Sequence, residues 1–164
     1  MAEKREGLFM WQIGVWEQEE KLAERVTALA EGKHAMVRAC SHPALLAGVE
    51  LDLLVVSPGA TGWAGALALS CHTALLPGGL SALTRSMPAG TVLSYGPSGR
   101  NTITLSGLND GHAAVAIQRE FPSLSGRSVE RQELVLPFDG TTTPDLCLAQ
   151  VGVALLLDRL PKRP

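Results

Sequence analysis

The sequence predicts an α/β fold: a three-layer, Rossmann-like, mainly parallel sheet that antiparallel hairpin strands extend and a C-terminal helix closes. Three observations predict it. Continuous apolar runs alternate with helical patterns up to about residue 100, which is typical of parallel strands buried on both faces. Polar and apolar residues then alternate, as in half-exposed antiparallel strands. A long apolar segment, "LCLAQVGVALLLDRL", comes last, and 164 residues fit one domain, residues 1–164.

Five strands are expected in the first part of the chain, at residues 8–16, 34–40, 51–57, 71–77 and 90–96. The first two flank a helical pattern whose apolar stripe consists of Leu22, Val26, Leu29 and Ala30. Near the positive N-terminal end of that helix lie three glutamates that favour it, Glu17, Glu19 and Glu20. Gly32 is placed to end the helix. Residues 41–50 have room for about two helical turns. Residues 63–70, "WAGALALS", are expected to form a short helix.

The later part of the chain is expected to form two hairpins and a helix. "SYGPSGRNTITLSGL" indicates two strands joined around Pro97, Ser98 and Gly99. In the second of these strands the apolar Ile103 and Leu105 alternate with the polar Thr102, Thr104 and Ser106. A further hairpin is predicted around "PSLSGR". The final helix begins with a capping Thr143, Pro144 at its first position and Asp145, and its apolarity implies burial on more than one side.

Composition restricts the partners and the location. The net charge of −2 and the lack of a long basic run argue against nucleic-acid binding. Only 18% of residues are charged, so we expect self-association, most simply as a homodimer through the antiparallel hairpin region or the C-terminal helix. No apolar run is long enough for a membrane span, and no signal peptide is recognisable, so a cytoplasmic protein without a membrane partner is expected. Three cysteines make a disulfide framework improbable.

A glycine-rich turn, "GATGWAG", follows the strand expected at residues 51–57. It resembles the "GATGFIG" turn of extended short-chain dehydrogenases, in which backbone amides hold a pyrophosphate. The acidic residue that would hold a ribose is absent after the next strand. The catalytic Tyr-x-x-x-Lys pair of that family is absent as well, because the fourth residue after Tyr95 is Gly99 and not a lysine. A hydride-transferring dehydrogenase is therefore not expected. Glycines that permit close helix-to-sheet packing are the alternative explanation, and no P-loop sequence occurs.

Two cysteine–histidine pairs, Cys40 with His42 and Cys71 with His72, lie at strand boundaries. Neither pair has the spacing of a local metal site, and Cys71 and His72 would point to opposite faces of a strand, so no metal is expected. A nucleophilic Cys40 beside His42 stays open, because it requires a lowered thiol pKa. Charged residues from Arg119 to Glu133 form either a rim for a partner or a solvated hairpin face.

Four segments between residues 67 and 138 resemble an uncharacterised family of small bacterial α/β proteins: "LALSCHTALLPGG", "VLSYGPSGRNTITLSGL", "VAIQREFPSLSG" and "VERQELVLPF". The resemblance implies no known activity. It singles out six positions, Pro77, Gly78, Tyr95, Gly96, Gln118 and Arg119. The strand–"YG"–hairpin order also resembles the end of the central domain of Mur ligases, although their ATP-binding P-loop is missing.

The site is expected beyond the carboxyl ends of the parallel strands, where open α/β sheets gather their ligands. The candidate ligand-binding residues are Ser41, His42, Ser57, Gly59, Thr61, Gly62, Pro77, Gly78, Tyr95 and Gly96. The sequence favours a nucleotide or other small anionic ligand there, held by backbone amides. The alternative is a non-enzymatic assembly or regulatory protein. Catalytic residues and a cofactor stay unassigned, and acid–base residues are scarce at these strand ends.

Overall fold

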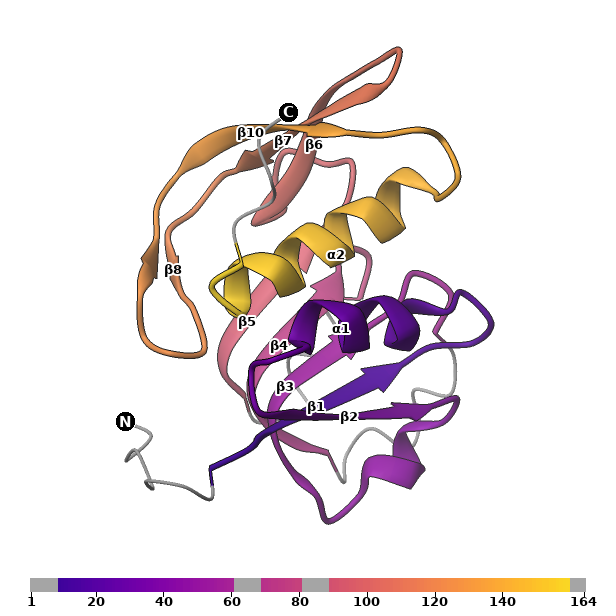
Figure 1. Ribbon diagram of the computed structural model, residues 1–164, viewed down its shortest axis with the longest axis vertical. Helices are drawn as coiled ribbons and strands as arrows, with labels where there is room; N and C mark the ends of the chain where they lie inside the picture. Colours follow the sequence, from indigo (N-terminus) through magenta and orange to yellow (C-terminus); the bar gives the residue numbers. More distant parts are fainter. Residues whose placement is uncertain (1–8, 61–68, 81–88, 160–164) are drawn as a thin grey trace.

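A single eight-stranded sheet organises the computed structural model, which describes residues 9–60, 69–80 and 89–159. Its order is β10-β7-β6-β5-β4-β3-β1-β2 (Figure 1). Pairing is parallel from β2 through to β6 and antiparallel between β6 and β7 and between β7 and β10. The strands are β1 (Trp11–Trp16), β2 (Ala35–Cys40), β3 (Glu50–Val56), β4 (Ser70–Pro77), β5 (Ala89–Tyr95), β6 (Ile103–Asn109), β7 (His112–Ile117) and β10 (Gln132–Pro137). The predicted fold class is confirmed.

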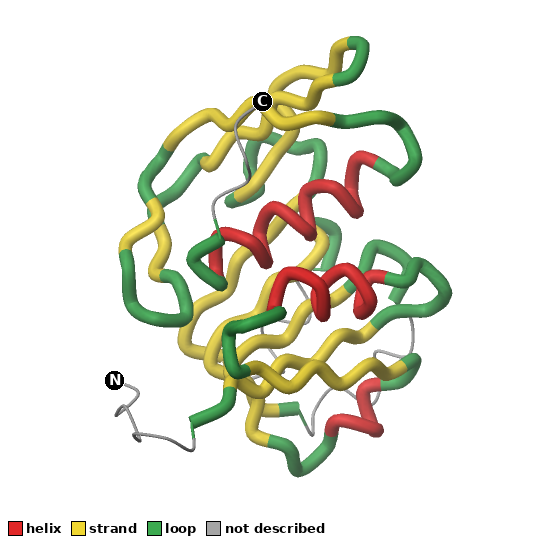
Figure 2. Tube along the Cα trace, viewed as in Figure 1, coloured by secondary structure: helices red, strands yellow, loops and turns green. Residues whose placement is uncertain are grey.

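Two helices, α1 (Leu22–Ala30) and α2 (Pro144–Leu156), lie side by side on one face of the sheet (Figures 1 and 2). Glu17 serves the N-terminus of α1 as expected, since its carboxylate accepts a hydrogen bond of 2.8 Å from the amide of Ala23. Glu19 and Glu20 instead lie in the turn before the helix. The predicted cap of α2 is confirmed: the Thr143 hydroxyl accepts a 3.3 Å bond from the amide of Leu146, and Pro144 follows it.

The core lies on both faces of the sheet. On the helix face, α1 and α2 cover the apolar side chains of the central strands, among them Val55, Leu75 and Ile103. On the opposite face, Trp16 and Leu54 pack with the short 3₁₀ helix η1 (Pro43–Leu46). Helix α2 is buried on several sides by its own chain, as its composition predicts. It therefore offers no broad apolar face to a second copy, and self-association stays a prediction without that helix as its basis.

The segment after β5 differs from the expected hairpin. β5 and β6 pair in parallel, at Tyr95 and Ile103, and the antiparallel partner of β6 is β7, across a turn at Asp110 and Gly111. Thr102 and Thr104 are only 5% and 4% exposed, so the predicted half-exposed alternation fails here. Its cause at Thr102 is a pair of bonds to Ser94: each hydroxyl accepts from the other residue's amide, at 3.1 and 3.2 Å.

The remaining differences are small. Residues 43–46 form a single 3₁₀ turn instead of two helical turns, because Pro43 begins it and the chain re-enters β3 at Glu50. The hairpin around "PSLSGR" is confirmed, and its tip forms a separate two-stranded ribbon, β8 (Phe121–Pro122) with β9 (Ser128–Val129). The helix expected at residues 63–70 falls almost wholly outside the described residues. Across the described part of the chain, no helix combines the length and apolarity that a membrane span requires.

Candidate functional site

The carboxyl ends of the parallel strands meet at one edge of the sheet, and the strand order defines a switch point there. The chain passes from β1 to β2 on one side and continues with β3, β4 and β5 on the other, so the order β2-β1-β3-β4-β5 reverses between β1 and β3. Ligands of open α/β sheets bind in the crevice at such a point. The amide of Ser57 donates to the carbonyl of Trp16 at 2.9 Å, which holds the two strand ends together.

The predicted site residues that are described all lie at or just after these strand ends, so they share the carboxyl edge. Ser41 and His42 follow β2, Ser57 and Gly59 follow β3, and the others, Pro77, Gly78, Tyr95 and Gly96, end or follow β4 and β5. Thr61 and Gly62 lie outside the described residues, so the structure describes only the first part of the glycine-rich turn.

A carboxylate of the chain itself rests against that turn. A Cβ on Gly59 would overlap Oε1 of Glu20, so the glycine leaves room for this position of the flexible carboxylate. The other carboxylate oxygen of Glu20 accepts a 3.1 Å bond from the amide of Gln18. Sequence analysis missed this neighbour because Glu20 was assigned to the start of α1. The signal that identifies it is its place in the short turn that follows β1, at the carboxyl end of the first strand.

Ser57 is fully buried beside the switch point, and its hydroxyl makes no hydrogen bond within the described part of the chain. An unsatisfied buried polar group costs about 1–3 kcal/mol. Among the predicted site residues that the structure describes, Ser57 is the one with a buried side-chain polar atom that lacks a hydrogen-bond partner.

Another side chain of the protein occupies the space beside the glycines that follow β4 and β5. A Cβ on Gly78 would overlap the amide oxygen of Asn101, and one on Gly96 would lie 2.9 Å from its Nδ2. The amide of Gly78 also donates to the carbonyl of Tyr95 at 2.9 Å. Gly96 has a φ of +153°, which also favours glycine. These glycines make room for a buried Asn101, a residue that sequence analysis did not single out.

Tyr95 serves the architecture of the edge. Its side chain is buried, and its hydroxyl donates a 2.6 Å hydrogen bond to the carbonyl of Val56, the last residue of β3. Burial raises the pKa of its phenol, and the negative charges of Asp145 and Glu20 raise it further. The phenol is therefore neutral, and its proton is donated in the hydrogen bond to Val56. Tyr95 thus links the end of β5 to the end of β3 and is not an acid or a base.

The structure argues against Cys40 as a nucleophile, because that role requires a lowered thiol pKa. Burial raises the pKa of its thiol from 9.0 to about 11, with the His42 backbone opposing and Glu17 adding to the rise. His42 is also engaged, because its Nδ1 accepts a 3.1 Å bond from the amide of Ala44 at the start of η1. Ser41 contributes its carbonyl to the side chain of Gln18, at 3.1 Å.

Thiol labelling tests this assignment. Burial raises the pKa of Cys71 to about 11 as well, and a pKa of about 11 in place of 9.0 lowers the thiolate fraction at pH 8 roughly 100-fold. We expect iodoacetamide to modify Cys40 and Cys71 at least 100-fold more slowly in the native protein than in guanidinium chloride, measured by peptide mass spectrometry. Modification of native Cys40 at the denatured rate would restore the nucleophile.

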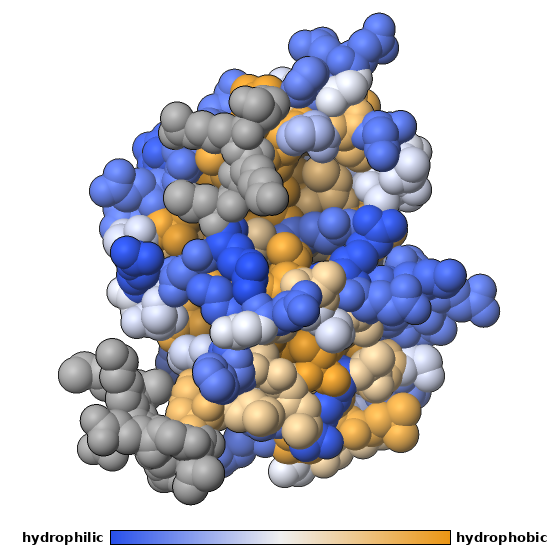
Figure 3. Space-filling model, in the orientation of Figure 1, coloured by the Kyte–Doolittle hydropathy of each residue, from blue (hydrophilic) through white to orange (hydrophobic). Residues whose placement is uncertain are grey.

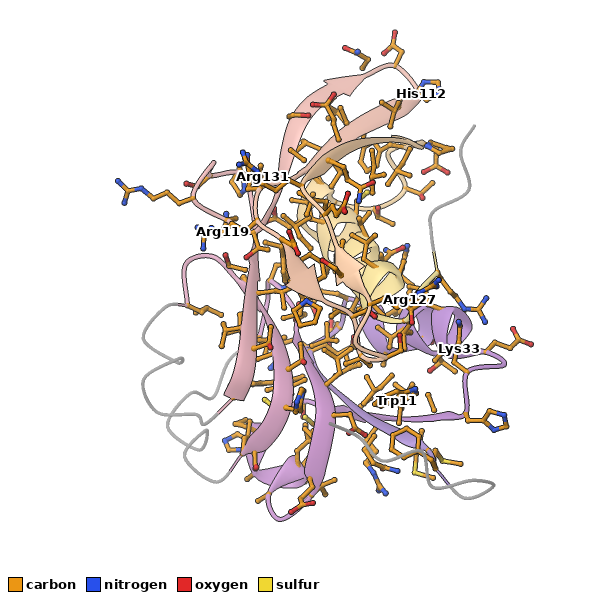
Figure 4. The ribbon with its side chains drawn as sticks, turned by 90° about the vertical axis from the view of Figure 1, so that its left-hand side faces the viewer. Trp11, Lys33, His112, Arg119, Arg127 and Arg131 are labelled. Atoms are coloured by element: carbon orange, nitrogen blue, oxygen red, sulfur yellow. The ribbon has the colours of Figure 1, made fainter. Side chains whose placement is uncertain are left out.

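Other candidate groups do not converge. Within the residues that the structure describes, no three His, Cys, Asp or Glu side chains gather as a metal site. The backbone amide of Gln118 donates a hydrogen bond to the carbonyl of Thr102 at 2.8 Å, and the Arg119 guanidinium donates one to the carbonyl of Arg100. Figure 4 places Arg119 near Arg131, whereas Arg127 lies on the other side, towards Lys33. The hairpin arginines therefore do not form one continuous rim.

Three surface hollows lie away from the carboxyl edge. One of about 750 Å³ runs between α1 and β2, and one of about 660 Å³ lies at the turns around Asp110 and Asp139. A third, of about 380 Å³, lies beside Arg127 and Arg159. Comparison of the sequence with protein-family models finds no match, and comparison with curated proteins finds none either.

Proposed function

We propose that this protein binds a small anionic ligand, such as a nucleotide phosphate or a carboxylate, at the switch point between β1 and β3. The observation that carries the proposal is the position of Glu20, whose carboxylate already rests against Gly59. A ligand oxygen would take the place of this carboxylate. The exposed Gly59 lets such an oxygen approach the backbone from solvent, because no Cβ blocks it.

Two further features support binding there rather than catalysis. Ser57 contributes a buried hydroxyl without a partner at the same strand end. The groups that sequence analysis considered for chemistry at this edge, Cys40, His42 and Tyr95, are a neutral thiol, an imidazole engaged by Ala44 and a phenol bonded to Val56. None of the three is poised as a nucleophile or a base.

Glu20 also sets the expected strength of binding. A ligand anion must displace this carboxylate, so the native protein binds small anions weakly. Two like charges about 4 Å apart repel by about 1 kcal/mol even in water, which is roughly a fivefold change in affinity. Removal of the Glu20 charge should therefore strengthen binding.

The test compares Glu20→Gln with the native protein and with Glu19→Gln, an exposed control in the same turn. Inorganic phosphate, AMP and succinate are titrated by isothermal calorimetry at low ionic strength. We expect Glu20→Gln to bind at least one of these anions about fivefold more tightly than the native protein. The Kd of Glu19→Gln should stay within about twofold of native. Absence of binding to Glu20→Gln for all three anions would overturn the proposal.

Assembly through protein–protein contacts is the second candidate function. The observation that favours it is the outer edge of β2, the last strand of the sheet, which carries the exposed Met36.

A further inference from the structure

Among the described residues, no strand pairs with the outer edge of β2, so its backbone groups on that side are left without a strand partner. The amide of Trp11 donates to the carbonyl of His34, and the amide of Glu17 donates to that of Cys40, at 2.8 and 2.9 Å. Even-numbered residues of β2 therefore direct their backbone groups towards β1. Because these directions alternate along a strand, Ala35, Val37 and Ala39 point their amides and carbonyls away from the sheet. Among the described strands none lies beyond β2 (Figures 1 and 2).

Within the described part of the chain, this edge has few of the features that usually protect one. The opposite edge strand, β10, ends in Pro137 and carries Gln132 and Glu133. β2 reads "AMVRAC", with Arg38 as its single charge, and it pairs with β1 in unbroken register without a bulge. Met36 is 40% exposed on it. Natural proteins blunt exposed edges with charge, proline or bulges, so an unprotected edge indicates a strand partner.

A hollow of about 750 Å³ lies next to this edge, on the helix face. Ala35 and Val37 of β2 form its floor, Ala28 of α1 forms its wall, and Met10 precedes β1 beside it. Figure 3 shows hydrophobic surface below α1, over the β1–β2 side of the sheet. A strand added along β2 would direct every second side chain to the helix face, into this hollow.

The charges at the hollow select its occupant. Glu24 and Glu31 of the α1 region both line it. A second copy related by a two-fold axis would bring both α1 helices, and with them four of these carboxylates, to one gap. Like charges placed together oppose such a pairing. A peptide fits both the hollow and its acidic lining when the side chains that it directs to the helix face include apolar residues as well as Lys or Arg.

We propose that the edge of β2 is a docking site for an extended, apolar and basic peptide segment of another protein, which adds to the sheet as a further strand. Backbone bonds to Ala35, Val37 and Ala39 hold the peptide. Its apolar side chains occupy the hollow, and Glu24 and Glu31 select its basic residues. This docking site is separate from the carboxyl edge, so the proposal of a bound peptide does not depend on the proposed anion site.

Fluorescence anisotropy of labelled peptides tests the docking site on the full chain. The probe is the peptide Val-Thr-Lys-Thr-Val-Thr-Lys, the Lys–Val peptide, whose Val and Lys side chains all point to one face of a strand. It is compared with its Glu-for-Lys counterpart and with an analogue whose central Thr is Pro. We expect the Lys–Val peptide to bind at least tenfold more tightly than both. The double variant Glu24→Gln/Glu31→Gln should weaken it at least fivefold. The control Glu130→Gln/Glu133→Gln, which neutralises two exposed carboxylates near β10, should change the Kd less than twofold.

Amide hydrogen exchange locates the bound peptide. Saturating Lys–Val peptide should slow exchange at Ala35, Val37 and Ala39 at least tenfold and leave the amides of β10 unchanged. Equal binding of the Lys and Glu peptides, or protection confined to other strands, would refute the site. Light scattering adds a further decisive outcome: a stable two-chain mass that excess peptide does not dissociate, with those three amides already protected, would assign the edge to a second copy and overturn the proposal.

Discussion

Leu75→Ala should lower the free energy of unfolding by about 3 kcal/mol, the middle of the range for a fully buried leucine whose loss leaves a cavity. Leu75 lies in β4 near the middle of the sheet, and its side chain is completely buried. Helix α2 packs directly on it: a Cβ on Gly152 would lie 2.8 and 3.1 Å from the two terminal carbons of Leu75. The glycine thus allows the helix to approach the sheet closely at this point.

Gly152→Ala probes the same contact from the helix side. The added methyl group overpacks the interface at a cost of about 1–3 kcal/mol, which exceeds the gain of about 1 kcal/mol from replacing a helical glycine. For the single variant Gly152→Ala, we expect the free energy of unfolding to fall by about 1 kcal/mol. In Leu75→Ala/Gly152→Ala, the methyl group occupies space that Leu75 vacates. The double variant should therefore be more stable than the sum of the single losses predicts, by at least about 1 kcal/mol.

Urea unfolding followed by circular dichroism measures all three variants. Gly107→Ala in β6 is the control, because its Cβ would meet only an ordinary contact at 3.7 Å from Ala114, and its stability should stay within about 0.5 kcal/mol of native. Strictly additive losses in the double variant would show that Leu75 and Gly152 do not share one packing contact.

Sequence patterns predicted the elements well where local chemistry and burial agree. The cap at Thr143 and the apolarity of "LCLAQVGVALLLDRL" both indicate α2. The same patterns do not reveal which side of the helix meets which strand, so the role of Gly152 becomes visible only in the fold. The parallel pairing of β5 with β6 also could not be predicted, since it depends on the turn that Ser94 and Thr102 close. The turn at Asp110 and Gly111 did carry a local signal, which was missed.

The candidate site was predictable as a place but not as a chemical environment. Strand ends follow from the apolar runs, and parallel strands bring those ends to one edge. The side chains that occupy the space beside Gly59 and Gly78 are Glu20 and Asn101, which come from other segments of the chain. No local pattern links them to these glycines. The acidic turn after β1 was the available clue, because it follows a strand end like the others.

Tyr95→Phe should lower the free energy of unfolding by about 1–2 kcal/mol, and Tyr95→Ala by about 4 kcal/mol. The phenylalanine keeps the buried ring but removes the bond to the carbonyl of Val56, which ties the end of β5 to the end of β3. The alanine variant also leaves a cavity on the helix face beneath α2. Chemical unfolding at pH 7 measures both losses, and equal stability of native protein and Tyr95→Phe would mean that the 2.6 Å bond contributes nothing net.

The pH dependence separates the hydroxyl from the ring. In the folded chain the pKa of Tyr95 lies above its ordinary value of 10.0, because burial first and then Asp145 and Glu20 disfavour the phenolate. Above pH 10 the unfolded chain therefore releases this proton while the folded chain keeps it, so stability falls as pH rises. Native protein should lose stability more steeply above pH 10 than Tyr95→Phe, with the difference between them shrinking. The buried thiols of Cys40 and Cys71 contribute equally to both proteins and cancel. Parallel stability curves between pH 9 and 11 would show that Tyr95 titrates in the folded protein as it does in the unfolded chain.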